Sequence, residues 1–547
     1  MNERYLETVR EQILGNDLVF ETPFGLRNIF YADYTASGRG LRFIEEKLLR
    51  ILKSYANTHT EDDYSGKYLT DLYHQAVARI KTLVNAQENG KVFPVGSGST
   101  GALKKLQEII GVYIPPLTKE RLGPSVPKSG APVVFIGPYE HHTNELMWRE
   151  ALAEVVVVRL SGRGEMDLPD LEAKVSDPRF SGRVKLGSFS AGSNITGVRT
   201  PVYEVAKICH RHNVAVFFDF AAVAPYAEIN MNKDRESYFD AVFFSPHKFL
   251  GGPGSSGILV INERLYRKDL PPTTAGGGTV VYVGFDTHDY AEDIETRETA
   301  GTPPILQAIK AALAMEVKEK IGVARIAGIE KENLAAFLEK LREVPNIRLV
   351  GSTAAPDLTP IVSFNITHED RILHPKFVTK LLNDLFGIQS RAGCSCAGPY
   401  GHRLLGIDAE RSERFRALIG RGFQGIKPGW VRVNIHYTFD RGDIDFLAKA
   451  VDFAARKGHL FLHDYGFDWK TGEWRHLDFK EKKVELSLEN DFRTRSADLS
   501  RKASLRAGYL REARRLAGRL EKERAPVYRK DGAEIEDLKY FHYIHSV

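Results

Sequence analysis

Between residues 92 and 261 the chain alternates short apolar runs with segments of helical periodicity, and this alternation restricts the fold more than any other feature. The runs are short and rich in Val, Ile and Phe, which is typical of strands buried on both faces. They lie at residues 92–95, 133–136, 154–159, 185–190 and 214–219, and on both sides of the turn in residues 240–261. The pattern predicts an α/β fold with a large, mostly parallel sheet, helices on both faces and ligands at the carboxyl ends of the strands.

The chain has 547 residues, which is more than one hydrophobic core usually serves, so we expect several domains. After residue 261 the pattern changes to that of a second, smaller α/β domain, and from about residue 456 to that of a helical extension. The expected segments are an N-terminal arm (1–30), a large domain (31–295), a small domain (296–455) and an extension with a basic helix (456–547).

The basic character of the chain belongs to this extension. Residues 491–530 hold thirteen Lys or Arg against five Asp or Glu, whereas the net charge of the whole chain is only +5. A weakly charged body gives no argument for a nucleic-acid enzyme. The helix expected over residues 499–523 carries one apolar stripe, formed by Leu505, Tyr509, Ala513, Leu516 and Leu520. The stripe predicts packing against the body or a second subunit, and an RNA or acidic-partner surface is the alternative.

The sequence also indicates a compartment. Its first residues are charged and do not resemble a secretory signal, and no apolar run is long enough to span a bilayer. Its three cysteines do not make a disulfide framework, which favours a reducing environment. We therefore expect a cytoplasmic enzyme without a membrane partner.

Lys248 lies in the polar, glycine-rich turn that follows the apolar run Val242, Phe243 and Phe244. A lysine at the end of a buried strand is placed inside the protein, where desolvation lowers the pKa of its ammonium group and frees the amine as a nucleophile. Such lysines form Schiff bases. The alternative is a lysine whose stem is buried and whose charge reaches water.

A second glycine-rich turn precedes the helix that begins near residue 98. Gly98, Ser99 and Thr100 stand where backbone amides and the helix dipole favour an anion, which makes them a candidate phosphate site. Ser245 and His247, beside Lys248, suit the same phosphate. A Gly/Ser turn alone is most often only a turn.

Two more residues complete a set that pyridoxal phosphate requires of a protein. Asp219 ends an apolar run and would keep the pyridine nitrogen protonated, while His141 would stack on the ring. The simpler interpretations are a helix N-cap for Asp219 and a hydrogen-bonded core histidine for His141. The order of these residues along the chain favours the cofactor site.

Several motifs resemble those of the class V aminotransferases, and among them the cysteine desulfurases and selenocysteine lyases. They are EHHTN (140–144), SNITG (193–197), SPHK (245–248), AGTP (300–303) and RAGCSCAGP (391–399), and the resemblance extends from about residue 31 to about residue 455. It implies fold type I, a homodimer, Asn194 near the phenolic oxygen of the cofactor, and Thr302 reaching the phosphate of the neighbouring subunit. Arg432 resembles the arginine that binds the substrate carboxylate, with Arg391 and His59 as further substrate-binding residues.

The same resemblance assigns Cys396 to the cysteine that takes sulfur from the substrate. It implies that Lys248 removes the α-proton of cysteine, that a Cys396 thiolate attacks the substrate sulfur, and that alanine is released from a persulfide enzyme. The persulfide sulfur would then pass to a sulfur-acceptor protein. Cys394 and Ser395 replace two histidines of the family pattern, and the Cys-x-Cys spacing is also similar to that of molybdenum-cofactor sulfurases.

Other interpretations stay open. The two cysteines could form a reversible disulfide, or half a metal site with His402, although no second ligand pair at metal spacing is evident, so we expect no metal. If Cys396 does not act, the same site could be that of a C–S β-lyase or an aminotransferase. Ala222 stands where desulfurases usually have Gln, so the substrate could differ too. A non-catalytic binding or scaffold protein on the same fold is the alternative of another class.

Overall fold

The computed structural model of the chain describes residues 2–58, 60–122, 130–352, 357–394, 396–522 and 526–547. Its contacts divide the chain into two compact units. Unit 1 comprises Met1–Ile13, Thr35–Ala327 and Ala354–Thr359, and unit 2 comprises Leu14–Tyr34, Gly328–Thr353 and Pro360–Val547. These units do not coincide with the four segments expected from the sequence, because residues 14–34 and the extension share a unit with the small domain. The four segments stay a prediction about separately folding parts.

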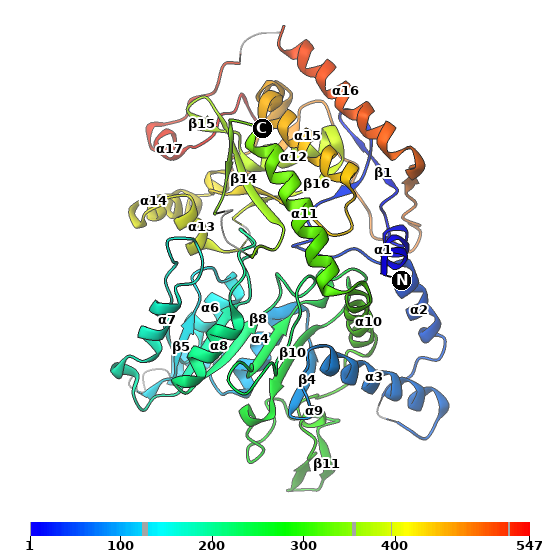
Figure 1. Ribbon diagram of the computed structural model, residues 1–547, viewed down its shortest axis with the longest axis vertical. Coiled ribbons are helices and arrows are strands. Elements are labelled where there is room, and N and C mark those ends of the chain that lie inside the picture. The colour runs from blue at the N-terminus through cyan, green and yellow to red at the C-terminus, as the bar shows by residue number, and fades with distance from the viewer. Residues whose placement is uncertain (1, 59, 123–129, 353–356, 395, 523–525) are drawn as a thin grey trace. The chain divides into compact units, whose positions relative to one another are not determined.

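A seven-stranded sheet forms the centre of unit 1, in the order β4-β10-β9-β8-β7-β5-β6 (Figure 1). Its strands are β4 (Gly90–Val95), β5 (Val133–Ile136), β6 (Glu154–Val157), β7 (Lys185–Ser190), β8 (Val214–Asp219), β9 (Ala241–Phe244) and β10 (Gly257–Asn262). Strands β6, β5, β7, β8 and β9 are parallel, while β10 is antiparallel to both β9 and β4. The mostly parallel sheet is confirmed, and the carboxyl ends of β4 and the five parallel strands share one edge.

Helices cover both faces of this sheet, because its strands carry apolar side chains on both. On one face α4 (Gly98–Ile109) and α6 (His142–Glu150) bring Leu103 and Trp148 into a core with Phe217 and Phe243. On the other face α8 (Val202–Arg211) places Cys209 beside Gly187 of β7. The other helices of this unit are α1 (Asn2–Glu11), α2 (Arg42–Leu52), α3 (Tyr64–Leu83), α5 (Pro116–Leu122), α7 (Leu168–Val175), α9 (Ile294–Arg297) and α10 (Ile305–Ile321), and the division between the units falls within α11 (Val323–Arg342).

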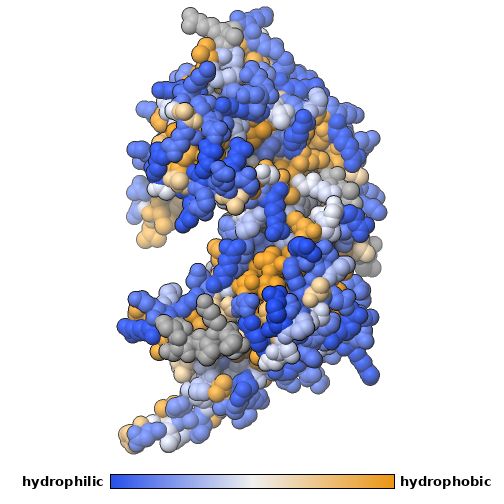
Figure 2. Space-filling model, turned by 90° about the vertical axis from the view of Figure 1, so that its left-hand side faces the viewer, coloured by the Kyte–Doolittle hydropathy of each residue, from blue (hydrophilic) through white to orange (hydrophobic). Residues whose placement is uncertain are grey.

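One hairpin of unit 1 exposes a run of apolar side chains. Strands β11 (Val280–Val283) and β12 (His288–Tyr290) pair with each other outside the seven-stranded sheet. Val281, Tyr282 and Val283 are 60–72% exposed, and Phe285 in the turn is fully exposed. The hairpin projects at the bottom of the view, with hydrophobic colour at its tip (Figures 1 and 2).

Unit 2 is built on an antiparallel sheet in the order β13-β14-β18-β17, with β15 on the end of β14. Its strands are β13 (Ile347–Leu349), β14 (Ile361–His368), β15 (Arg371–Ile372), β17 (Arg391–Gly393) and β18 (Trp430–Asn434). The N-terminal segment joins this unit, since β3 (Phe30–Tyr31) pairs with β16 (Ile388–Gln389) and Ala32 accepts a hydrogen bond from the Asn434 amide. Residues before 35 therefore reach the strands that carry Arg391 and Arg432.

The basic helix of the extension packs on the body of unit 2. Helix α16 (Lys502–Leu520) contacts α12 (Pro375–Phe386) and α15 (Arg441–Lys457), and buries Ala513, Leu516 and Leu520. Glu512 pairs with the buried Arg27 at 2.8 Å. The packing predicted from the apolar stripe is confirmed.

The remaining α-helices and strands of unit 2 are β1 (Leu18–Thr22), β2 (Gly25–Asn28), α13 (Gly398–Leu404), α14 (Ala409–Gly420), β19 (Tyr465–Phe467), β20 (Trp474–His476), β21 (Arg495–Ser496), α17 (Ala533–Leu538) and β22 (His545–Ser546).

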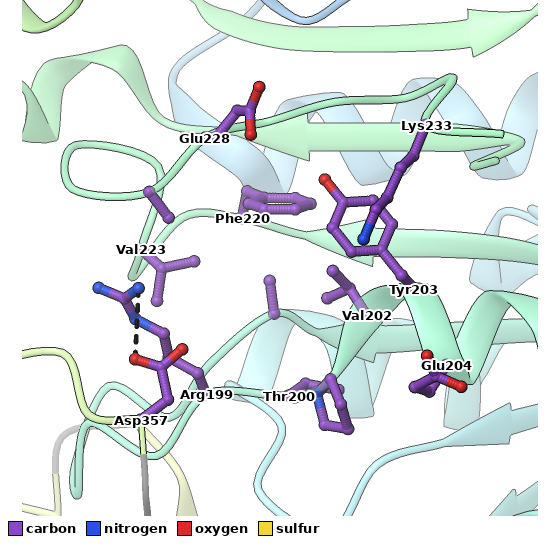
Figure 3. Close-up of a pocket in the computed structure, with 13 residues that line it drawn as sticks. Arg199, Thr200, Val202, Tyr203, Glu204, Phe220, Val223, Glu228, Lys233 and Asp357 are labelled. Carbon is purple, nitrogen blue, oxygen red and sulfur yellow. Dashed lines mark ion pairs between the residues drawn. The ribbon is translucent and has the colours of Figure 1, made fainter. Parts of the chain in front are cut away.

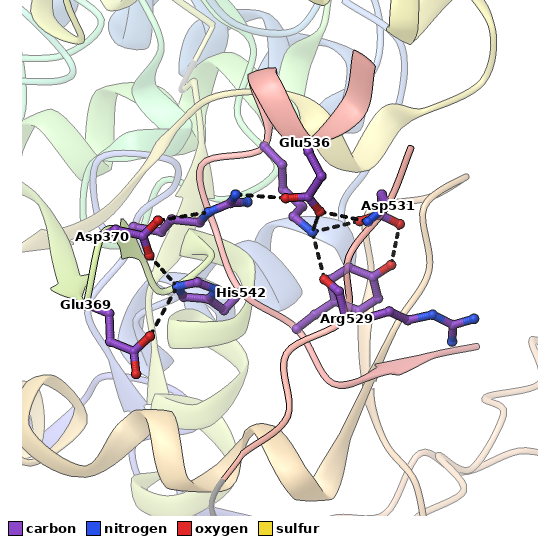
Figure 4. Close-up of polar contacts among 9 residues, drawn as sticks. Glu369, Asp370, Arg529, Asp531, Glu536 and His542 are labelled. Carbon is purple, nitrogen blue, oxygen red and sulfur yellow. Dashed lines mark hydrogen bonds and ion pairs between the residues drawn. The ribbon is translucent and has the colours of Figure 1, made fainter. Parts of the chain in front are cut away.

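Ion pairs attach the last residues of the chain to the β14–β15 hairpin (Figure 4). His542 lies 3.0 Å from the Asp370 carboxylate, and Arg371 donates to Glu536 at 2.8 Å. Lys539, which is almost fully buried, pairs with Asp531 at 2.8 Å and with Glu536. Among the helices that the structure describes, none is long and apolar enough to cross a membrane.

Candidate active site

The residues predicted to hold a cofactor follow the carboxyl ends of neighbouring strands of unit 1. Asp219 is the last residue of β8. The others follow a strand: Gly98 and Ser99 follow β4, His141 follows β5, Asn194 follows β7, and Ser245, His247 and Lys248 follow β9. Since these strands point the same way, the topology gathers their ends at one edge of the sheet. This is the edge at which open α/β sheets bind ligands.

The predicted phosphate site is a close packing of the first turn of α4 against the turn after β9. The Ser99 amide donates to Ser245 Oγ at 2.9 Å, and the two serine hydroxyls lie 3.0 Å apart. Gly98 has φ +72°, and a Cβ at this position would lie 2.9 Å from both Ser245 Oγ and His247 Cε1. Only glycine fits there, so backbone, hydroxyls and imidazole converge at a helix N-terminus, as phosphate binding requires.

His247 is neutral at physiological pH. Burial, and then the charge of Lys248, lower its pKa to about 4. A neutral imidazole has one N–H to donate, which suits a phosphate oxygen. Thr100, the third predicted residue of the turn, is exposed, and its hydroxyl lies 2.9 Å from the Thr143 hydroxyl.

Asp219 is a buried carboxylate, only 4% exposed. Burial raises its pKa, while the Ala221 amide at 2.9 Å, the charge of Lys248 and the Ser99 hydroxyl lower it. Such a carboxylate is stabilised by a cation beside it, and the protonated nitrogen of a pyridine ring is a group of that kind. Lys248 itself is half-buried at the end of a short 3-10 helix, Pro246–Lys248.

His141 is half-buried and caps α6. Its Nδ1 accepts a hydrogen bond from the Thr143 amide at 3.2 Å, so the neutral ring carries its proton on Nε2. Asn194, predicted near the phenolic oxygen, is 9% exposed. Thr302 is exposed and accepts from the Asn57 amide at 3.0 Å, and its role toward a neighbouring subunit stays a prediction. His59 lies outside the described residues.

Glu140 is a residue that sequence reasoning did not assign. Its buried carboxylate accepts from the Gly137 amide at 2.9 Å, from the amide and hydroxyl of Ser190, and from the Asn144 side chain at 2.6 Å. Burial raises its pKa to about 7, with the Asp219 charge adding to the rise. It ties the ends of β5 and β7 together beside His141. Its position, an acid just beyond a buried strand, was the signal available in the sequence.

The predicted substrate-binding arginines lie opposite each other in unit 2. Arg391 on β17 and Arg432 on β18 are register partners. Both bind one carboxylate: Arg432 donates to Asp33 Oδ1 at 2.9 Å, and Arg391 donates to Asp33 Oδ2 at 2.9 Å. Sequence reasoning missed Asp33, because nothing local marks a partner 399 residues away.

The two close cysteines are exposed and free, and the third is not a candidate nucleophile. Cys394 follows β17, and Cys396 lies in the turn before α13 with φ +57°. Ser395 lies outside the described residues. Cys209 is buried, and burial raises the pKa of its thiol. Within the described ranges, metal-compatible spacing is found at Glu369, Asp370 and His542, and not for Cys394 and Cys396 with His402.

A separate cavity of about 290 Å³ in unit 1 contains none of the predicted site residues (Figure 3). An ion pair of 3.5 Å between Arg199 and Asp357 stands on one side of it. On the other side the Lys233 ammonium lies 4.1 Å from the centroid of the Tyr203 ring. Glu204 and Glu228 also line this cavity.

Comparisons with known proteins agree with this arrangement. The chain is 28% identical over 439 residues to a probable cysteine desulfurase of Halalkalibacterium halodurans, covering 79% of this chain and 95% of that one. It is 27% identical to a probable cysteine desulfurase of Streptomyces coelicolor, covering 68% and 84%. The fold matches a cysteine desulfurase of Thermococcus onnurineus with a TM-score of 0.64 at 24% identity, covering 82% and 98%.

A family model also matches most of the chain. The family model "Aminotransferase class-V" matches residues 30–447. The glycine that admits no Cβ at position 98, the neutral His247 and the buried Asp219 fit the phosphate and the pyridine nitrogen of pyridoxal phosphate. The chain belongs to the class V aminotransferase family of pyridoxal-phosphate enzymes.

Proposed function

We propose that this protein is a cysteine desulfurase that takes sulfur from L-cysteine, or a related amino acid, onto Cys396 and releases alanine. The observation that carries the proposal is the exposed, free thiol of Cys396 on a turn at positive φ, next to the strand of Arg391. The sulfur of the substrate joins the Cys396 sulfur, and the carbon–sulfur bond of the substrate breaks. The enzyme thiol and cysteine are thereby converted into an enzyme persulfide and alanine, without an external oxidant.

The residues of this chain divide the work of that reaction. Lys248 accepts the proton of the substrate α-carbon and later returns it. His141, with its proton on Nε2, would stack on the ring of the cofactor. Arg432 and Arg391 bind the substrate carboxylate through their guanidinium groups.

Pyridoxal phosphate supplies, when bound, an electron sink for the substrate α-carbon. Gly98, Ser99, Ser245 and His247 would hold its phosphate, with Thr100 beside them. Asp219 would keep the ring nitrogen protonated, and Asn194 would lie near the ring oxygen.

We further propose a cytoplasmic homodimer that passes its sulfur to an acceptor protein. The exposed hairpin β11–β12 offers a second copy an apolar surface. Thr302 of each copy then contributes to the phosphate site of the other.

The test separates the two cysteines. We expect Cys396→Ser to abolish alanine release from L-cysteine, because no thiolate remains to take the sulfur, while Cys394→Ser lowers the rate without abolishing it. Alanine and pyruvate are measured separately, and visible absorbance of the bound cofactor confirms that both variants are loaded. Lys248→Ala, which removes the covalent anchor, serves as the inactive control. Equal alanine release by Cys396→Ser and wild type would refute the proposal.

A second candidate, a C–S β-lyase, is favoured by one departure from the family. Ala222 stands where desulfurases usually have Gln, so one contact to the cofactor oxygen is missing. A β-lyase would release pyruvate, and its activity would survive in Cys396→Ser. An aminotransferase would instead release the keto acid of its substrate.

A further inference from the structure

Asp33 lies between Arg391 and Arg432, and its charge affects which substrates these two arginines can bind. Arg391 and Arg432 are directly opposite on antiparallel strands. Like charges at such positions lie about 5 Å apart at Cβ and destabilise the pair. A carboxylate that binds both removes this repulsion.

Asp33 is that carboxylate, and it comes from the N-terminal segment of unit 2. Its two oxygens are divided between the guanidinium groups, Oδ1 to Arg432 and Oδ2 to Arg391, at 2.9 Å each. The Arg432 side chain is 4% exposed and that of Asp33 11%, so solvent screens this contact weakly.

A small ligand can nevertheless reach the Arg391 side of the group. The Arg391 side chain is 49% exposed, and Asp33 and Arg391 both border a cavity of about 1660 Å³ within unit 2. Arg391 uses its Nε for Asp33, which leaves the two terminal nitrogens of its guanidinium directed away from that bond.

The charges of the group select its ligand. Two guanidinium groups and one carboxylate have a net charge of +1, which a single substrate carboxylate neutralises. A ligand with two carboxylates would leave an excess negative charge beside the buried Arg432–Asp33 contact. We infer that Asp33 is a specificity-determining residue. It orients both arginines and restricts the site to amino acids whose only carboxylate is the α-carboxylate. The inference rests on the proposed role of Arg432 and Arg391 in binding that carboxylate.

The experiment compares two probes, L-alanine and L-aspartate, which differ by one carboxylate. Their dissociation constants are measured with the cofactor-loaded enzyme by its visible absorbance. In Asp33→Asn, the group gains one net positive charge, and we expect the affinity for L-aspartate relative to L-alanine to rise at least tenfold. In Arg391→Gln, the group loses one positive charge, and the same ratio is expected to fall. The double variant Asp33→Asn/Arg391→Gln is expected to return the ratio to near the wild-type value.

Asp443 provides a matched control. Its carboxylate also bridges two cations of unit 2, Lys502 at 3.1 Å and Arg506 at 2.5 Å, and its side chain is 10% exposed. Asp443→Asn is expected to leave the ratio within twofold of wild type. A change there as large as in Asp33→Asn would overturn the inference, as would an unchanged ratio in Asp33→Asn.

Two precautions keep the outcome decisive. If Asp33→Asn does not fold, Arg391→Gln decides alone, and a ratio that rises or stays within twofold overturns the inference. If the wild type binds both probes but releases no alanine from cysteine, the proposed desulfurase activity fails while the binding ratios still test Asp33.

Discussion

Substituting Gly98 by Ala tests the phosphate site with a single methyl group. Residue 98 begins α4 with φ +72°, and the new Cβ would lie 2.9 Å from Ser245 Oγ and His247 Cε1. One of these two side chains must move, which would remove the hydrogen bond proposed from it to the cofactor phosphate. A hydrogen bond to a charged group contributes about 1.5–3 kcal/mol, so the affinity for pyridoxal phosphate is expected to fall roughly 10- to 150-fold.

A matched control lies just beyond the end of the same helix. Gly111, just after α4, has φ +74°, but a Cβ there would meet nothing within 4 Å. Both substitutions place an L-residue in the left-handed region, which costs about 1–2 kcal/mol of conformational energy. Both are therefore expected to lower the free energy of unfolding of the apoprotein, Gly98→Ala by more because Ser245 or His247 must also move, and only Gly98→Ala is expected to weaken binding of the cofactor.

The assay is a titration of each apoprotein with pyridoxal phosphate, followed by visible absorbance, with urea unfolding of the same samples. A dissociation constant for Gly98→Ala within twofold of that for Gly111→Ala would refute the reasoning. It would mean that the turn after β9 does not form the phosphate site.

Two further predictions concern Glu140 and the hairpin. Burial raises the pKa of Glu140 from 4.5 to about 7, so the unfolded chain releases this proton first and stability falls as the pH rises from about 4.5 to about 7. In urea unfolding, Glu140→Gln should reduce the loss in the free energy of unfolding between pH 5 and pH 8 by at most about 3 kcal/mol. An unchanged loss would contradict the raised pKa. Phe285→Asp, at a fully exposed position of the hairpin turn, should shift the proposed dimer to monomer in sedimentation velocity. A dimer that survives this change would place the interface elsewhere.

The part of the site that lies along parallel strands could be predicted from the sequence. Asp219 and Lys248 each follow an uninterrupted apolar run, and parallel strands bring such ends to one edge whatever the details of packing. Gly98 belongs to the same group, because a glycine-rich turn before a helix is a local pattern.

The rest was decided by tertiary structure. Asp33 meets Arg432 across 399 residues, and no periodicity in either segment records that pairing. The raised pKa of Glu140 comes from burial, which outweighs the opposite effect of its hydrogen-bond donors, and only the packed sheet supplies that burial. The sequence by itself thus determined which side chains stand at the ends of the strands, because strand and helix patterns are local. The folded chain decided which charges those side chains face, because burial and long-range pairing are properties of the whole molecule.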